Sequence, residues 1–302
     1  MRVAVMGAGA VGCYYGGMLA RAGHEVTLIG RASHVEAMNT RGLRLQTQAF
    51  DQHIAVRAST DVQAIAGCEA LLFCVKSSDT ETAGTAVRPH LPQGIPVLSL
   101  QNGVDNADRL SAVLNQAVIA SVVYVGTEMA GAGHVLHHGR GELVLGDGPH
   151  TAACAQWLAQ AGIPNQISAN IRGALWTKFI INGVYNAPSA ITQLPYGQMV
   201  AVPGMWALMR QAFDECMAVA NAAGVELDQP VWPMIEGIAQ SMQGQYSSTA
   251  QDLQKGKSTE IDHLNGTLVR LGEALGVPTP THLSLWSLVK GLERTRERAS
   301  TH

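Results

Sequence analysis

Short apolar runs alternate with helix-length segments along the first half of the chain. These runs are almost continuously apolar, which is typical of strands that helices cover on both faces. A regular alternation of such strands with helical segments predicts a parallel sheet with crossover helices. We expect five strands of this kind, at Arg2–Met6, Glu25–Ile29, Ala70–Val75, Pro96–Leu100 and Ala117–Val125.

Two further stretches alternate apolar and polar residues more evenly and are bounded by glycines or turns. His53–Arg57 is one, and the other comprises Gly133–His138 followed by Glu142–Gly146. This pattern predicts edge strands or a hairpin. We therefore expect the sheet to be mixed, with antiparallel strands at one side.

From about Asn170 the strand pattern gives way to long helical segments. Between Met205 and Ala220, apolar residues recur at i, i+3, i+4 and i+7, which predicts a helix with one buried face. Prolines interrupt this half of the chain and are expected to break its helices. They stand at Pro188, Pro195, Pro203, Pro230, Pro278 and Pro280.

The first strand runs directly into Gly7, Ala8, Gly9, Ala10, Val11 and Gly12, a GxGxxG motif that opens a helix of small residues. In a dinucleotide-binding turn the first glycine allows the sharp turn, the second admits a pyrophosphate, and the third lets helix and strand pack closely. An ordinary glycine-rich turn is the alternative. The sequence thus predicts an α/β protein with an N-terminal Rossmann-type dinucleotide-binding domain over residues 1–168, followed by an all-α C-terminal domain over residues 169–302.

The second predicted strand ends at Gly30 and Arg31, where a site that prefers NAD would normally carry an acidic residue. A guanidinium can bind a 2′-phosphate instead, so this position favours NADPH, unless Arg31 is simply a solvated loop residue. Lys76 follows the strand that ends at Val75 and could add a second positive charge near that phosphate.

Composition narrows the class of protein. The 302 residues are 47% hydrophobic and carry a net charge of −3, which indicates a folded globular protein without a broad nucleic-acid-binding or membrane-binding surface. The five cysteines are scattered, and no CxxC pair or secretory signal is evident, so we expect a cytoplasmic protein without disulfides or a metal site. The uncharged stretch Phe179–Met209 contains several Asn, Gln and Pro residues, so we interpret it as protein interior rather than a membrane span.

The second half contains one stripe of polar residues that could take part in catalysis or substrate binding. Lys178, Asn182 and Asn186 are spaced i, i+4 and i+8, which places a cation and two amides on one helix face. A lysine in an apolar setting is a better proton donor, and amides can orient a carbonyl or a hydroxyl. A solvated or capping face is the alternative. Glu260, taken alone, is more typical of a helix-terminal carboxylate than of a catalytic one.

Taken together, these segments resemble the ketopantoate reductase (2-dehydropantoate 2-reductase) family from Gly7 to Gly266. GxGxxG is common to many dehydrogenases, whereas the lysine segment followed by SSxxQD and TEID in this order is specific to the family. The resemblance rests on GAGAVG at Gly7–Gly12, QNGVDN at Gln101–Asn106, Lys178 with Asn182 and Asn186, SSTAQD at Ser247–Asp252, and TEID at Thr259–Asp262.

The resemblance implies reduction of 2-dehydropantoate to pantoate by NADPH, a step in pantothenate and coenzyme A biosynthesis. By matching motif positions, Lys178 would donate the proton and Glu260 would bind the substrate hydroxyl and position the lysine. Asn102 would lie between the nicotinamide ribose and the reacting centre. The remaining matches are Asn182, Asn186 and Ser248 for the substrate, and Arg31 and Lys76 for the 2′-phosphate.

Several alternatives stay open. Thr249 and Lys257 depart from the family pattern near the expected substrate side, so the substrate could be another 2-keto acid. A protein of another class, a non-catalytic NADPH-binding regulatory module, would keep the nucleotide site and use its helical half for protein contacts. His137 and His138 could suggest a metal, but no ligand with convincing spacing lies nearby, and surface histidines fit better. The sequence allows a monomer or a homodimer.

Overall fold

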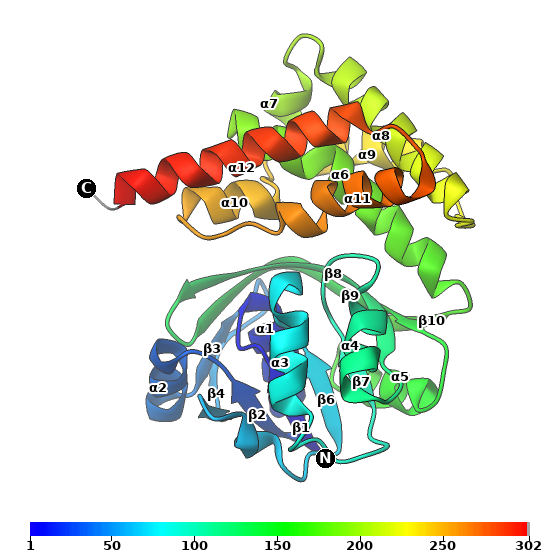
Figure 1. Cartoon of the computed structure of the whole chain (residues 1–302). Helices are drawn as coiled ribbons and strands as arrows, with labels where there is room; N and C mark the ends of the chain where they lie inside the picture. The colour runs from blue at the N-terminus through cyan, green and yellow to red at the C-terminus, as the bar shows by residue number, and fades with distance from the viewer. Residues whose placement is uncertain (301–302) are drawn as a thin grey trace. The chain divides into compact units, whose positions relative to one another are not determined.

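The chain folds into two compact units, Met1–Ile171 and Arg172–His302, in a computed structural model that describes the backbone of residues 1–300 (Figure 1). The first unit is an α/β domain, and the second is helical throughout its described part. The sequence-based prediction of a Rossmann-type domain followed by an all-α domain is therefore confirmed.

The strands of unit 1 form one mixed sheet in the order β4-β3-β9-β8-β7-β6-β1-β2-β5, with β10 beside β9. Its central strands pair in parallel, whereas β8 pairs with β9 and β3 with β4 in antiparallel fashion. The expectation of antiparallel strands at one side is thus confirmed. The strands are β1 (Arg2–Met6), β2 (Glu25–Ile29), β3 (Leu43–Gln46), β4 (Asp51–Ile54), β5 (Arg57–Ser59), β6 (Ala70–Phe73), β7 (Val97–Ser99), β8 (Ile119–Gly131), β9 (His134–Gly146) and β10 (Asn165–Ser168).

Successive side chains of the central strands enter two different cores, as the pleat of a strand requires. Val3 and Val5 of β1 pack against α1 and α5, whereas Ala4 between them belongs to the core that α3 and α4 cover. Both faces of the sheet are therefore buried, which explains the continuously apolar strands. The helices are α1 (Ala10–Arg21), α2 (Ala32–Arg41), α3 (Thr80–Val87), α4 (Asn106–Leu114) and α5 (Thr151–Gln160).

Two sequence-based strand predictions were wrong in detail. His53–Arg57 is not one strand, because the chain leaves β4, which pairs with β3, at Ile54 and enters β5, which pairs with β2, at Arg57. The two segments expected around Gly133–Gly146 are a single strand, β9, which forms a hairpin with β8. Positive φ angles at Gly139, Arg140 and Gly141 and shifts in register let this strand bend without ending.

Unit 2 begins with a long helix that carries the predicted polar stripe. The expected break at Pro188 is wrong, because α6 continues through it to Thr192. A proline inside a helix costs about 3 kcal/mol, and here the buried packing of residues 183–190 offsets that cost. The helices are α6 (Ile171–Thr192), α7 (Tyr196–Val200), α8 (Met205–Ala222), α9 (Val231–Ser241), α10 (Ser248–Gln254), α11 (Asn265–Leu275) and α12 (Pro280–Ser300), with a 3₁₀ turn, η3, at Ile261–His263.

Candidate functional site

The glycine-rich turn joins β1 to α1, and two of its glycines are required by the protein itself. Gly7 has a φ of +104°, and a Cβ there would lie 2.8 Å from the carbonyl carbon of Cys74, the residue after β6. At Gly12, a Cβ would overlap the Gly7 carbonyl oxygen and stand 2.9 Å from Val5 Cγ1. The first glycine therefore allows the turn, and the third allows α1 to pack on β1.

Gly9 differs from both, because nothing in the protein demands a glycine there. It is exposed, a Cβ would meet no atom within 4 Å, and its φ of −86° suits any residue. No side chain caps α1 at this residue, and no acidic residue lies in its first turn. The first N–H groups of a helix lack acceptors within the helix and attract anions. The turn thus fits a pyrophosphate closely approaching Gly9.

The turn lies where the order of the sheet reverses. From β1 the chain enters β2 on one side, then forms β3 and β4 at the other end of the strand order and β5 beside β2, and only then reaches β6 on the other side of β1. Met6 pairs with both Ile29 and Phe73, and Phe73 pairs with Ser99, so four strands end at one edge. Ligands of open α/β sheets bind at such a reversal, outside the carboxyl ends of the strands.

The three other predicted nucleotide residues follow these strand ends. Arg31 is exposed and precedes α2, two residues after β2 ends. Lys76 and Asn102 are half-buried and stand three residues beyond β6 and β7. A Cβ on Gly30 would come within 2.6 Å of Ala8 Cβ, so this glycine brings the end of β2 against the phosphate turn.

A buried hydrogen-bond network holds the Asn102 loop. The Asn102 carbonyl accepts from Ser77 Oγ at 2.7 Å and from Asn106 Nδ2 at 2.6 Å. Arg109 donates to Asn106 Oδ1 and to the Ser77 carbonyl, and it pairs with Glu81. Sequence reasoning gave these residues no role, although Asn106 ends the QNGVDN segment, because the partners lie about 30 positions apart in the chain.

In unit 2, α6 carries Lys178, Asn182 and Asn186 at the predicted helical spacing. Lys178 and Asn182 are half-buried, whereas Asn186 is only 3% exposed. The Asn186 backbone carbonyl accepts a hydrogen bond from Ser247 Oγ. A side-chain amide can donate and accept hydrogen bonds, so Asn186 could bind a polar ligand.

The start of α10 is bonded to α6 beside Asn186. Ser247 Oγ donates to the Asn186 carbonyl at 3.2 Å and accepts from the Ala250 N–H at 3.0 Å, which caps α10. The Ser247 N–H donates to Ser189 Oγ at 3.2 Å. Ser248, the next residue, is exposed. The structure therefore brings the predicted substrate residue Ser248 to the same part of α6 as Asn186.

Glu260 precedes η3 and is half-buried, and the loop that carries it leads into α11 at Asn265. The Asn265 side-chain amide is wholly buried and donates to the Gly183 carbonyl at 3.1 Å and to His282 Nδ1 at 2.9 Å. Gly183 is the neighbour of Asn182. Asn265, which sequence reasoning did not single out, thus ties the start of α11, five residues after Glu260, to the helix that carries the predicted lysine.

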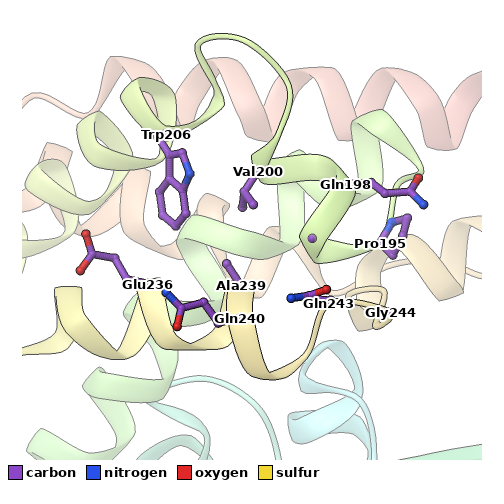
Figure 2. A pocket seen from close by; sticks show the side chains of 10 residues that line it. Pro195, Gln198, Val200, Trp206, Glu236, Ala239, Gln240, Gln243 and Gly244 are labelled. Atoms are coloured by element: carbon purple, nitrogen blue, oxygen red, sulfur yellow. The ribbon is translucent and has the colours of Figure 1, made fainter.

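One cavity in unit 2, with a volume of about 980 Å³, lies apart from these residues among α7, α8 and α9. Figure 2 shows its lining, which combines the indole of Trp206 with the amides of Gln240 and Gln243. None of the predicted site residues lines it. It is lined by Pro195, Gly197, Gln198, Val200, Trp206, Glu236, Ala239, Gln240, Gln243 and Gly244.

The remaining polar candidates have structural partners. His137 stacks on Tyr14 and shares a hydrogen bond with the Arg140 carbonyl, and His138 lies 3.1 Å from Glu128. Among the described residues, no cluster of three or more His, Cys, Asp or Glu side chains could hold a metal ion. Burial raises the pKa of the Cys13 thiol to about 12, so this thiol stays protonated.

A separate observation concerns the predicted interior of the second half. Within residues 1–300, none of the helices combines the length and the apolar character that crossing a bilayer requires. The uncharged stretch from Phe179 onward lies in α6, α7 and the residues that follow them, and many of its side chains are buried within the protein.

Comparison with known families identifies both units. Residues 3–150 match the family model described as ketopantoate reductase PanE/ApbA, and residues 170–293 match the model of its C-terminal part. The 2-dehydropantoate 2-reductase of Pyrococcus abyssi is 30% identical over 298 residues, which cover 97% of this chain and 98% of that protein.

Two solved structures have the same fold as this chain. A PanE/ApbA family ketopantoate reductase from Ralstonia eutropha JMP134 is 57% identical, with a TM-score of 0.96 over 98% of this chain and 100% of that one. A D-mandelate dehydrogenase solved with NADH and anilino(oxo)acetate is 26% identical, with a TM-score of 0.92 over 98% and 100% of the two chains.

Proposed function

Because the chain belongs to the ketopantoate reductase family of nicotinamide-dinucleotide-dependent oxidoreductases, we propose that it reduces 2-dehydropantoate to pantoate with NADPH. This reaction would place it in pantothenate and coenzyme A biosynthesis. The observation that carries the proposal is the arrangement in unit 2, where the start of α10 and the start of α11, five residues after Glu260, are both bonded to the helix of Lys178.

Unit 1 has the features that a dinucleotide needs. Gly9 leaves open space at the start of α1, and the ends of β1, β2, β6 and β7 share one edge. When bound, NADPH would supply the hydride. Arg31 is exposed and stands where an acidic residue would select NAD, so its guanidinium supports the choice of a 2′-phosphate, with Lys76 as a second cation.

Unit 2 would bind the substrate and donate the proton. Reduction of a ketone develops negative charge on oxygen, which a fixed ammonium stabilises before it donates a proton. We assign this role to Lys178. Glu260 accepts a hydrogen bond from the substrate hydroxyl and positions the lysine. Asn182, Asn186 and Ser248 bind the substrate, and the hydrogen bond from Ser247 Oγ to the Asn186 carbonyl supports grouping Ser248 with Asn186.

The substrate assignment is tested by the initial rate of NADPH oxidation with three 2-keto acids. We compare 2-dehydropantoate with 2-ketoisovalerate, which lacks the hydroxymethyl group, and with phenylglyoxylate. Fast turnover that is selective for 2-dehydropantoate supports the proposal. Faster turnover of either other acid assigns the same chemistry to another substrate, and NADPH binding without turnover of any acid indicates a non-catalytic nucleotide-binding module.

A second candidate is reduction of another 2-keto acid by the same residues. Its support is the similarity to a D-mandelate dehydrogenase, whose solved complex contains NADH and anilino(oxo)acetate. Thr249 is buried directly after Ser248, and a change there can alter the shape of a substrate site without touching Lys178 or Glu260. The phenylglyoxylate arm of the experiment addresses this candidate.

A further inference from the structure

The residues on either side of Glu260 are held by one helix, α12. Thr259 donates from its backbone N–H and its hydroxyl to the same oxygen, Glu293 Oε1, at 2.8 and 2.7 Å. The Asp262 carboxylate accepts from Trp286 Nε1 at 2.7 Å and from Lys290 Nζ at 2.8 Å. Glu260 therefore lies between two attachment points on α12.

Lys290 joins these two attachments. Its ammonium lies 2.8 Å from Asp262 Oδ2 and 2.7 Å from Glu293 Oε2. We call Trp286, Lys290 and Glu293 the α12 clamp. Without the ammonium, the carboxylates of Asp262 and Glu293 would lose the cation that bridges them, so the attachments on both sides of Glu260 would weaken.

The Glu260 segment has little internal structure that could hold it alone. Its only regular element is the single 3₁₀ turn η3, with the His263 N–H donating to the Glu260 carbonyl at 2.9 Å. Gly256, Lys257 and Ser258, which precede it, are exposed. Ile261 is fully buried and anchors the backbone after Glu260, and its N–H donates to Thr259 Oγ1 at 3.2 Å. The clamp in turn holds Thr259 through Glu293.

The electrostatics agree with this geometry. Burial acts to raise the pKa of the Asp262 carboxyl, but the hydrogen bonds from Lys290 and Trp286 outweigh it and hold that pKa below its ordinary value. Burial also opposes ionisation of Glu293, and the donors Lys290 and Thr259 again lower its pKa. Both carboxylates are therefore ionised at neutral pH, and the bridging ammonium stabilises their charged forms.

We propose that Lys290 is a positioning residue, which fixes the Glu260 carboxylate through Thr259 and Asp262 without touching the substrate. This inference rests on the role proposed above for Glu260. It predicts that the loss caused by removing Lys290 passes through Glu260, so that the two residues do not act independently.

The test is a double-mutant cycle on the full chain, with NADPH and 2-dehydropantoate. Lys290→Met should lower kcat/KM by about 10- to 100-fold, the range expected when a functional group is displaced by about 1 Å. Lys290→Arg, which keeps the bridging charge, should restore most of the rate. Adding Lys290→Met to Glu260→Gln should cause less than about a threefold further loss, because the group it positions is gone.

A second readout does not depend on activity. Backbone hydrogen exchange in a peptide covering residues 258–264 should be at least about tenfold faster in Lys290→Met, while exchange in α8 and the affinity for NADPH stay unchanged. Glu293→Gln removes the other half of the bridge and should give the same pattern, so the test does not depend on the folding of one variant.

The results distinguish failure of the positioning role from failure of the proposed function. If Glu260→Gln is impaired but Lys290→Met is fully active, or if the losses in the double variant multiply, the positioning role is overturned and the proposed function stands. If Glu260→Gln is as active as the unchanged protein, the role proposed for Glu260 is wrong, and the positioning role falls with it. Unchanged exchange over residues 258–264 also overturns the inference.

Discussion

Gly9 shows how one residue can be unnecessary for folding and still be required by a ligand. Its open surroundings and ordinary φ predict that Gly9→Ala changes the free energy of unfolding by less than about 1 kcal/mol, the scale of a helix-cap change. The added methyl group would meet the pyrophosphate, so the Kd for NADPH should rise at least about tenfold. Urea unfolding and a fluorescence titration measure the two effects.

Gly12→Ala provides the matched contrast. Its Cβ would overlap the Gly7 carbonyl and press on Val5, so this variant should lose about 1 to 3 kcal/mol of stability, as overpacked cores do. If both variants lost the same stability, the assignment of Gly9 to the ligand rather than to the fold would be wrong.

Arg31 is predicted to select between the two nicotinamide cofactors. Arg31→Ala should raise the KM for NADPH by about 10- to 100-fold, because a charge-assisted pair contributes roughly 1.5 to 3 kcal/mol, and should leave the KM for NADH nearly unchanged. Arg41→Ala, which removes an exposed arginine from the other end of α2, is the control. An equal effect on both cofactors would remove Arg31 from 2′-phosphate recognition.

At the scale of elements, Asn265 ties α6, α11 and α12 together. Asn265→Ala leaves the Gly183 carbonyl and His282 Nδ1 without their buried donor, so stability should fall by about 2 to 4 kcal/mol. Exposed Asn221→Ala on α8 should change it by less than about 0.5 kcal/mol. Chemical denaturation measures the free energy of unfolding of both variants. Equal values for Asn265→Ala and Asn221→Ala would show that the Asn265 hydrogen bonds are dispensable.

The α12 clamp should make part of the stability depend on pH. The pKa of Glu293 is lowered in the folded protein, so its contribution is present above the ordinary carboxyl pKa of about 4.3 and is lost as the pH falls through the lowered value. Glu293→Gln should therefore lower Tm by a few degrees at pH 7 and by progressively less below about pH 4. Calorimetry at pH 7 and below about pH 4 measures the Tm difference between Glu293→Gln and the unchanged protein. A Tm difference that does not change with pH would contradict the prediction.

Most elements of the fold follow from local pattern, and the exceptions have physical causes. The strands of the parallel core were predictable because both of their faces are apolar. β9 was split in the prediction because Gly139 and Gly141 are typical of turns, yet here they bend one strand. β3 and β10 were not predicted, because each is a four-residue strand that is stabilised by its neighbour β9 rather than by its own pattern. Pro188 is tolerated only because of tertiary packing.

At the scale of the whole molecule, motifs identify site residues but not what holds them. Lys178, Asn182 and Asn186 share a helix, so their spacing was enough to place them together. The contact of Ser247 with Asn186 spans 61 positions and that of Asn265 with Gly183 spans 82, and no local pattern encodes them. The partners that position the Asn102 loop and Glu260 were missed for the same reason.

The most direct test of the central claim is a single-turnover measurement of the NADPH-loaded protein with 2-dehydropantoate, in which the absorbance of the reduced nicotinamide is followed. We predict that Lys178→Ala lowers the rate by roughly 10² to 10⁴, the range for a positioned general acid, without changing NADPH affinity. Exposed Lys255→Ala should react at the rate of the unchanged protein. Equal rates with and without Lys178 would contradict its role as the proton donor.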